Sequence, residues 1–277
     1  MFAQPVITLG DSPLTYHDVV AVARDGARLE ISAAAWARIA NAQAIVQRIV
    51  ASGEPAYGIS TGLGALSQVL LHGEQLAQLS RNTLLSHACG VGVLLSGAQT
   101  RAILVAALAN FCQGYSGLQP SVVEGLQTLL NLHITPCVPS QGSVGYLTHM
   151  AHISLALLGV GDVRWQGRTL PAAEALQANG LQPLVLGAKD GLCLVNGTPC
   201  MTGLAALALA DMERLADWAD VTGAMGFEAL GGQIAAFDAD ILALKPHPGM
   251  QWVGQRLRSL LAGSEVPVGC RELAAEF

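Results

Sequence analysis

The chain has 277 residues, of which 52% are hydrophobic and only 12% are charged, and its formal net charge is −6. Because an ordinary soluble domain is about 25% charged, too few charges remain to solvate the surface of a monomer, and we expect helices that are buried in an oligomer. The negative charge and the absence of Lys/Arg clusters argue against a nucleic-acid-binding surface. The sequence has no run of about 20 mainly apolar residues, so no membrane span is predicted. The N-terminus lacks the pattern of a secretory signal.

Alanine and leucine recur at helical spacing along most of the chain, so the predicted class is mainly α. Ser32 is a candidate N-cap for a helix that runs to about Ser52, with Gly53 beyond its end. Further helices are expected at 73–88, 96–112, 119–131, 147–158, 172–178, 201–220 and 250–262.

Strand patterns are confined to short pieces, which we interpret as two hairpins. One pairs Val6–Thr8 with Leu29–Ile31, and the other turns at Gln166-Gly167 between Val163–Trp165 and Arg168–Leu170. Passages rich in Gly and Pro lie between the helices, at 58–64, 135–145 and 187–203. Loops on a rigid scaffold are where binding and catalytic groups tend to lie.

Six cysteines are scattered along the chain without a CxxC pair: Cys89, Cys112, Cys137, Cys193, Cys200 and Cys270. This distribution indicates buried thiols in a protein of the reducing cytoplasm.

The first segment with chemical potential is Ala56–Gly64, with the sequence AYGISTGLG. Its three glycines permit backbone shapes that other residues avoid, so the loop could hold Tyr57 against a ligand. It does not match a phosphate-binding loop, because no GK[ST] follows. From the residues alone, a packed loop tyrosine is the simpler interpretation.

Two further segments leave two interpretations open. His87, in SHACGVG near the end of an apolar helix, is either a core histidine with satisfied hydrogen bonds or a contact to a polar ring in a pocket. Asn196-Gly197, in GLCLVNGT, is either a common turn pair or an amide that contacts a substrate carboxylate or amine.

Together, the ordered motifs AYGISTGLG, SHACGVG, QGYSGL, PSQGSVG, LALLGVGDV, GLCLVNGT and LKPHPG resemble the histidine, phenylalanine and tyrosine ammonia-lyase family. The resemblance runs from about residue 5 to the C-terminus. It implies a mainly α lyase fold with a small N-terminal α/β-hairpin domain and the start of a central bundle of long helices. We expect the N-terminal lyase domain, with the active-site loops, at 1–200 and the start of the bundle at 201–277.

The resemblance implies a carbon–nitrogen lyase that eliminates ammonia or an amine from a histidine-like amino acid to give a urocanate-type arylacrylate. It gives Tyr57 the role of the base that removes the β-proton, while Asn196 positions the amino group and supports the electrophile. The pair Ser86-His87 resembles the histidine-specific branch, so an imidazole substrate is favoured. Ser86, His87 and Gly64 are accordingly expected to bind the substrate.

The electrophile loop departs from the family. There, GSVG is followed by Ala-Ser-Gly, which cyclises autocatalytically to methylidene-imidazolone (MIO), the electrophile that captures the substrate amine. Here Gly142, Ser143 and Gly145 remain, and the chain passes directly into Tyr146. We therefore expect no MIO group, and no other cofactor is evident. The alternative is a modified tripeptide that a sequence of standard residues omits; the changed flanks, Tyr146 and His149, favour a deletion.

Without that electrophile, expulsion of a simple ammonium has lost its main transition-state stabiliser. The ergothionases, which resemble histidine ammonia-lyase but lack MIO, eliminate trimethylamine from a histidine betaine, and a trimethylammonium needs no such activation. This MIO-independent elimination is the first alternative function, and a non-catalytic oligomerising scaffold is the second.

Two further expectations concern ligands and partners. His149 and His152 lie at i and i+3 on a predicted helix, but no third ligand stands at a recognisable spacing, so no metal site is predicted. Members of the family continue for about as many residues again. A second polypeptide that supplies this C-terminal half is therefore expected, unless the chain is a fragment.

Overall fold

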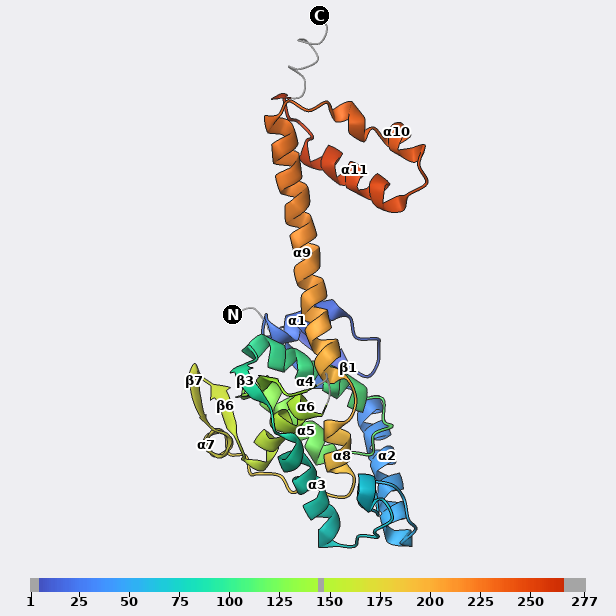
Figure 1. The fold of residues 1–277 in the computed structure, drawn as a ribbon, viewed down its shortest axis with the longest axis vertical. Coiled ribbons are helices and arrows are strands. Elements are labelled where there is room, and N and C mark those ends of the chain that lie inside the picture. Colours follow the sequence, from blue (N-terminus) through green and yellow to red (C-terminus); the bar gives the residue numbers. More distant parts are fainter. Residues whose placement is uncertain (1–4, 144–146, 267–277) are drawn as a thin grey trace, which may run out of the picture. The chain divides into compact units, whose positions relative to one another are not determined.

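The computed structural model describes residues 5–143 and 147–266. The chain divides into two compact units, Met1–Ala208 and Leu209–Phe277. Helices predominate in both, which confirms the predicted mainly α class (Figure 1). The helices of the first unit are α1 (Tyr16–Ala23), α2 (Ala33–Ser52), α3 (Glu74–His87), α4 (Gly97–Phe111), α5 (Pro120–Asn131), α6 (Thr148–Leu155), α7 (Ala172–Ala178) and α8 (Asp190–Val195), with 3-10 turns η1 (Gly64–Leu66) and η2 (Ala156–Leu158).

Helix α2 begins and ends as its sequence predicts. The Ser32 hydroxyl accepts a hydrogen bond from the Ala35 N–H at 3.1 Å, and Gly53 closes the helix in the left-handed conformation, with φ of 69°. Both are standard devices for the unpaired backbone groups at helix ends.

Helix α4 forms the centre of the first unit, where ten of its residues are buried. One of them is Arg101, whose guanidinium donates to the carbonyls of Val22, a buried residue near the end of α1, and Leu130, near the end of α5, each at 2.7 Å. Burial lowers the pKa of Arg101. Its two hydrogen bonds compensate for the hydrogen bonds to water that the guanidinium loses on burial, and they fix the ends of α1 and α5 on α4.

The strands form three small sheets: β1 (Val6–Leu9) with β2 (Arg28–Ile31), β3 (Val91–Leu94) with β5 (Pro139–Gln141), and β4 (Thr135–Pro136) with β6 (Asp162–Trp165) and β7 (Arg168–Pro171). The β6–β7 hairpin is confirmed. Its turn residues Gln166 and Gly167 have φ of 48° and 75°, as a two-residue hairpin of type I′ requires.

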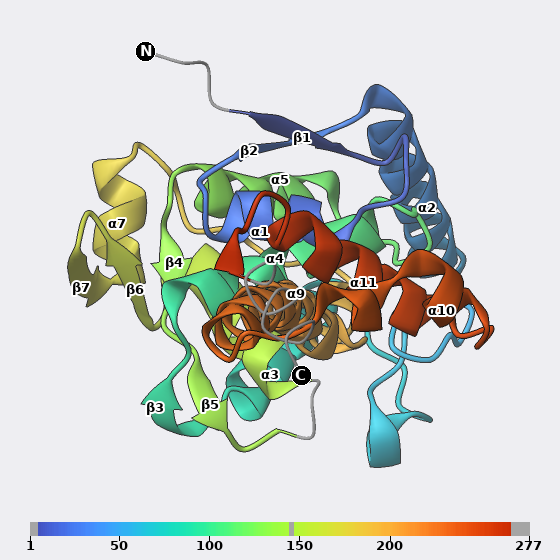
Figure 2. The same cartoon turned by 90° about the horizontal axis from the view of Figure 1, so that it is seen from above.

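The first expected hairpin is wrong in its direction. Strands β1 and β2 do pair, but they are parallel, and α1 connects them (Figure 2). A parallel pair needs such a crossover instead of a tight turn. Side chains of α5 complete the bonding of β2: Asn131 Oδ1 accepts from the Leu29 N–H at 3.0 Å, and the Asn131 and Gln127 amides donate to the Leu29 carbonyl.

The second unit contains the later part of α9 (Pro199–Ala229), η3 (Ile234–Phe237), α10 (Ala239–Ala243) and α11 (Pro248–Leu260). Arg256 of α11 forms an ion pair with Asp217 of α9 at 2.5 Å. Helix α9 extends beyond the predicted range 201–220 at both ends, and α1, α8 and α10 were not predicted.

The passage 187–203 was predicted to be a loop but contains α8 and the start of α9. Among the described residues one helical stretch, Asp190–Ala229, is long and apolar enough to cross a membrane by length and composition alone. Its most apolar window has a mean hydropathy of 1.6 and is 44% buried. Core helices of globular proteins meet the same criteria.

The cysteines only partly match the expected buried thiols. Among the described residues all are free, with Cys112, Cys193 and Cys200 buried, Cys137 half-buried and Cys89 exposed. Burial raises the pKa of the Cys112 and Cys193 thiols to about 11. Cys270 lies outside the described residues.

The buried carboxylate of Asp190 fixes the start of α8. It is fully buried, and it accepts hydrogen bonds from the Gln119 N–H at 3.1 Å, the Gln119 side-chain amide at 2.5 Å and the Gly187 N–H at 2.7 Å. Burial raises the pKa of Asp190, while these three donors oppose that shift. Gln119 is the N-cap residue of α5, so the carboxylate ties α8 to α5.

Replacing Asp190 with Asn should lower the free energy of unfolding by about 1–3 kcal/mol, because the new amide N–H₂ would face N–H donors and leave buried groups unpaired. Urea unfolding followed by far-ultraviolet circular dichroism measures the change. Asp11→Asn, at an exposed carboxylate, is the matched control and should have little effect. Equal stability of the two variants would contradict the anchoring role.

Candidate active site

The loop that carries Tyr57 is folded by its own small polar side chains. The Ser60 hydroxyl donates to the Glu54 carbonyl at 2.5 Å and accepts from the Ala56 N–H at 2.9 Å. Ser60 and Thr61 are buried, whereas the Tyr57 side chain is 59% exposed. The interpretation as a packed loop tyrosine is therefore wrong, and the phenol is available to a ligand.

Two residues assigned to the site, Tyr57 and Gly64, lie together. The Gly64 N–H donates to the Tyr57 hydroxyl oxygen at 3.4 Å. Gly64 has φ of 56°, a conformation that favours glycine, and it begins the η1 turn. The loop thus folds back on itself so that its backbone meets the phenol oxygen.

Helix α8 supports this loop and carries Asn196 at its end. Gly58 has φ of 66°, and a Cβ placed there would lie only 2.4 Å from Leu192 Cδ2, so the glycine lets the loop rest directly on α8. The Leu192 carbonyl accepts from both the backbone N–H of Asn196, at 3.1 Å, and its side-chain amide, at 2.9 Å. Asn196 is exposed, and its amide is held against its own helix.

The end of α3 presents Ser86 and His87. His87 is half-buried, and its Nδ1 lies 2.7 Å from the Thr83 carbonyl and 3.2 Å from the Ser86 hydroxyl. A carbonyl can only accept, so the bond to Thr83 places the proton on Nδ1. In the neutral ring, Nε2 is then the hydrogen-bond acceptor.

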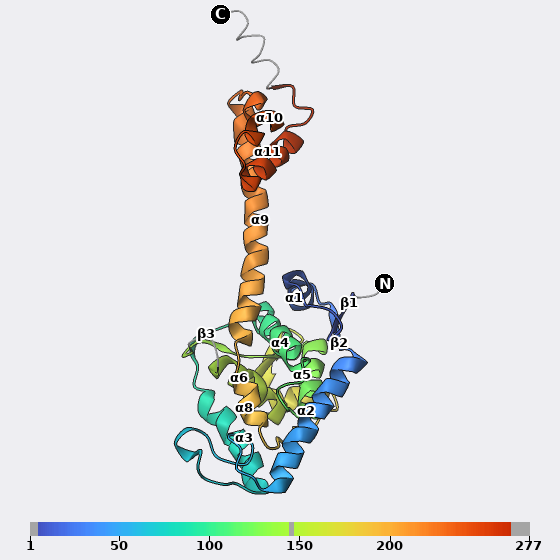
Figure 3. The ribbon, with the colours of Figure 1, turned by 90° about the vertical axis from the view of Figure 1, so that its right-hand side faces the viewer.

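Helices α3 and α8 approach each other closely. A Cβ at Gly191 would lie 2.4 Å from the Ser80 carbonyl oxygen, and the Ser80 hydroxyl donates to the Gly187 carbonyl at 2.6 Å. Figure 3 shows the two helices in the same part of the first unit. This packing relates the element with His87 to the element with Asn196.

Helix α6 and its N-cap residue join the remaining segments. The Leu147 N–H donates to the Val195 carbonyl at 3.1 Å, next to Asn196. The Thr148 hydroxyl donates to the Gly142 carbonyl at 3.1 Å, and the Gly90 N–H donates to His152 Nε2 at 3.0 Å. One short helix therefore binds the end of α8, the electrophile loop and the segment that follows His87.

Of the electrophile-loop remnant, Gly142 and Ser143 are described, whereas Gly145 and Tyr146 lie outside the described residues. Gly142 has φ of 100°, and a Cβ there would lie 3.3 Å from the Gly90 Cα. The two glycines allow the loop and the segment after α3 to cross at close range.

His152 contacts this crossing through Gly90, and His149 lies one turn earlier on α6. His149 is 5% exposed; its Nδ1 has no hydrogen-bond partner among the described residues, and a hydrogen bond to the Ser140 backbone partly opposes the lowering of its pKa by burial. Burial, and to a lesser extent His149, lowers the pKa of His152. In the described part of the chain, no group of three or more His, Cys, Asp or Glu residues could hold a metal ion.

Sequence reasoning did not single out the residues that assemble these segments. Leu192, Thr148 and Gly90 act through contacts between distant parts of the chain. The only signal for them was the recurrence of glycines in the motifs around Tyr57, His87 and Gly142.

The chain belongs to the aromatic amino acid lyase family, whose model matches residues 14–275. It is 43% identical to histidine ammonia-lyase of Deinococcus radiodurans over 92% of this chain and 49% of that protein. It is 44% identical to histidine ammonia-lyase of Symbiobacterium thermophilum over 91% of this chain and 50% of that protein. The chain therefore spans about half the length of these relatives.

Solved structures give the same assignment. Histidine ammonia-lyase from Trypanosoma cruzi is 34% identical, with a TM-score of 0.88 over 94% of this chain and 52% of that chain. Ergothionase from Treponema denticola, described as an ergothioneine-degrading enzyme, is 29% identical, with a TM-score of 0.89 over 94% of this chain and 53% of that chain. The expected lyase-like helical fold is confirmed.

The bond from Gly90 to His152 requires a neutral imidazole, because a protonated Nε2 would place an N–H against an N–H. The pKa of His152 is lower in the fold than its usual value of about 6.5, so the unfolded chain binds more protons between these two values. The free energy of unfolding should thus be fully present above about pH 6.5 and fall as the pH drops through that window.

Urea unfolding at pH 7.5 and pH 5.5 tests this dependence. His152→Gln keeps an acceptor but does not titrate, so the loss of stability between the two pH values should be smaller than in the parent. His133, whose pKa is also lowered, and Asp190, whose pKa is raised, contribute equally to both proteins and cancel in the comparison. His149 interacts electrostatically with His152, so the difference between parent and variant includes that interaction. An identical loss in parent and variant would show that His152 is not responsible.

Proposed function

We propose that this chain is the N-terminal half of a carbon–nitrogen lyase that removes an amine from a histidine-like amino acid and leaves a urocanate-type arylacrylate. The observation that carries the proposal is that α8 and α6 bring together the Tyr57 loop, the segment after α3 and Asn196. The histidine ammonia-lyases that the chain resembles support the choice of substrate.

Each site residue has a role that its geometry supports. Tyr57 is exposed, and segment 56–64 contains no Asp, Glu or Lys, so Tyr57 is the candidate base for the β-proton. His87, with its proton on Nδ1, can accept from an imidazole N–H of the substrate through Nε2. In this proposal Ser86 and Gly64 complete the substrate site, and Asn196 turns its amide from Leu192 towards the substrate amine.

The residues present do not fit the family's MIO group, since Ala-Ser-Gly is missing between Gly145 and Tyr146. We therefore route no step through it and propose that the chain has no cofactor. This absence favours elimination of trimethylamine from a histidine betaine as a second candidate. Tyr57 would remove the β-proton, its electron pair would form the carbon–carbon double bond, and the C–N bond would break to release neutral trimethylamine.

A second polypeptide is proposed to supply the other half of the enzyme. In the second unit, α9 leaves large apolar side chains exposed: Met212, Leu215, Trp218 and Met225, at 61–64% of their surface. At 100° per residue these positions fall within about 140° of the helix circumference, so they form one apolar face, which is typical of a helix that packs against a neighbour along that face. The partner chain, further copies of this chain and a cytoplasmic setting, to which the free thiols are suited, belong to the same proposal.

Changing Tyr57 to Phe removes one hydroxyl and little volume, so the fold should survive while turnover falls about 10²- to 10⁴-fold. His87→Leu should mainly weaken discrimination in favour of the imidazole. The assay is the ultraviolet absorbance of urocanate formed from histidine and from its trimethylated betaine by the reconstituted complex. Parental turnover by Tyr57→Phe would disprove the assigned base, and a parent inactive on both substrates would favour the scaffold alternative.

Intact-mass measurement of the purified complex should give the mass of the encoded chain, and borohydride or cyanide should leave activity unchanged, because no MIO group is present to react. A mass larger by three residues less two waters, together with inactivation by either reagent, would show that the tripeptide is present. The same spectrum reports whether a second chain is bound.

A further inference from the structure

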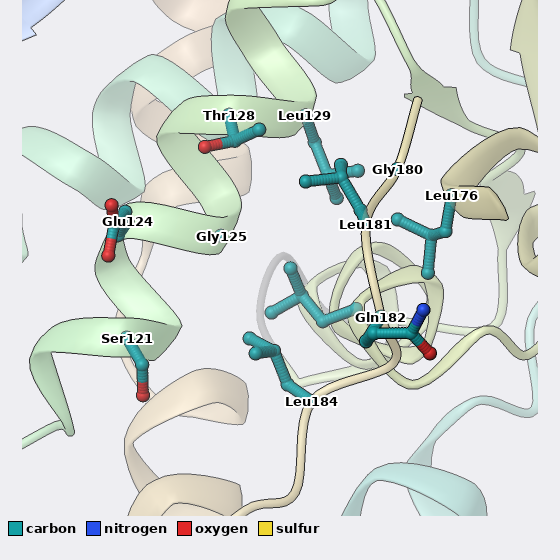
Figure 4. A pocket seen from close by; sticks show the side chains of 11 residues that line it. Ser121, Glu124, Gly125, Thr128, Leu129, Leu176, Gly180, Leu181, Gln182 and Leu184 are labelled. Atoms are coloured by element: carbon teal, nitrogen blue, oxygen red, sulfur yellow. The ribbon is translucent and has the colours of Figure 1, made fainter. Parts of the chain in front are cut away.

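A pocket of about 330 Å³ lies in the first unit between α5, η2, α7 and segment 180–184. Its apolar wall consists of five leucines: Leu129, Leu157, Leu176, Leu181 and Leu184. Figure 4 shows leucine side chains from the α5, α7 and 181–184 walls facing one another across this space. None of the candidate active-site residues lines the pocket, and its volume is within the range of small-molecule sites.

Backbone hydrogen bonds hold the pocket walls in place. The Leu181 N–H donates to the Leu176 carbonyl at 2.9 Å, and the Leu184 N–H donates to the Leu157 carbonyl at 2.8 Å. On α5, Gly125 admits this segment closely, because a Cβ there would lie 2.9 Å from Leu184 Cδ1 and 3.0 Å from Leu157 Cδ2. The pocket is therefore formed by the fold before any ligand binds.

The polar groups of the pocket lie mostly along one edge. Ser121, Glu124 and Thr128 stand at i, i+3 and i+7, on one face of α5 beside the leucines (Figure 4). Glu124 is exposed, and it takes part in none of the ion pairs between described residues. A carboxylate and two hydroxyls at the edge of an apolar wall complement a molecule with one cationic end and an apolar body.

We propose that this pocket is a second ligand site, which takes a small primary amine whose ammonium group pairs with Glu124 and whose apolar body lies among the leucines. The site is separate from the candidate active site and does not depend on the proposed function.

Ligand-observed NMR titrations of the purified chain, in the assembly it forms, test the site with cyclohexylmethylamine and its neutral analogue cyclohexylmethanol. The amine should bind with a Kd of about 1 mM, as expected for a ligand of this size, and more tightly than the alcohol. Glu124→Gln should weaken amine binding about 2- to 5-fold, the effect of an exposed ion pair. Leu181→Trp, which fills the pocket, should abolish binding of both compounds.

Two control variants locate the bound amine. Glu174→Gln, at an exposed carboxylate on α7 outside the pocket lining, should leave binding unchanged, and so should Tyr57→Phe. Equal affinities for amine and alcohol, or no effect of Glu124→Gln, would overturn the role of the carboxylate. Binding that survives Leu181→Trp, or that is lost in Tyr57→Phe, would place the amine elsewhere and overturn the site.

Discussion

Three hydrogen bonds of α6 and its N-cap residue, Leu147, hold together segments that are up to 105 residues apart in the sequence, with Gly90 and Val195 at the two extremes. They join Gly90 to His152, Thr148 to Gly142 and Leu147 to Val195. The segments they join are rich in glycine, and an unrestrained glycine loses more conformational freedom on folding than any other residue. Without these contacts, the loop remnant and the segment after α3 would lack a defined relation to α8. The candidate site therefore depends on a helix that contributes none of the proposed catalytic groups.

Buried charged side chains fix the helices around the candidate site in the same way. Asp190 fixes the start of α8 on α5, and Arg101 fixes the ends of α1 and α5 on α4. In both cases a charged side chain is buried and pairs with backbone groups of distant elements. Because a buried charge is costly unless its hydrogen bonds are satisfied, each of these residues specifies one arrangement of its neighbours.

Local sequence signals predicted the elements they control directly. The cap residues Ser32 and Gly53 bounded α2, and the Gln166-Gly167 turn marked the β6–β7 hairpin. The parallel pairing of β1 with β2 escaped prediction because strand direction depends on the intervening α1, an eight-residue helix that was not predicted although Thr15 and Asp18 form a capping box at its start. The six-residue α8 was missed for a similar reason, since glycine and proline flank it and tertiary contacts stabilise it.

For the site, motifs identified the segments but not their contacts. The ordered motifs led to the family, which the comparisons confirmed, and they pointed to Tyr57, Ser86, His87 and Asn196. They could not show that Tyr57 is exposed, because exposure depends on how Ser60 and Thr61 turn inward, nor that Gly58 rests on Leu192. Such relations arise from the packing of residues that are distant in sequence.

Because the cysteines are unevenly buried, the chain has a thiol to which a chemical label can be attached. Burial raises the pKa of Cys112 and Cys193 to about 11, so at pH 7 both are almost entirely in the less reactive thiol form, and both are also shielded from reagents. Cys89 is the exposed thiol among the described residues, and it stands two positions after His87. A maleimide-linked fluorophore or spin label would attach there in preference to the buried thiols and report on events beside the imidazole without any engineered substitution.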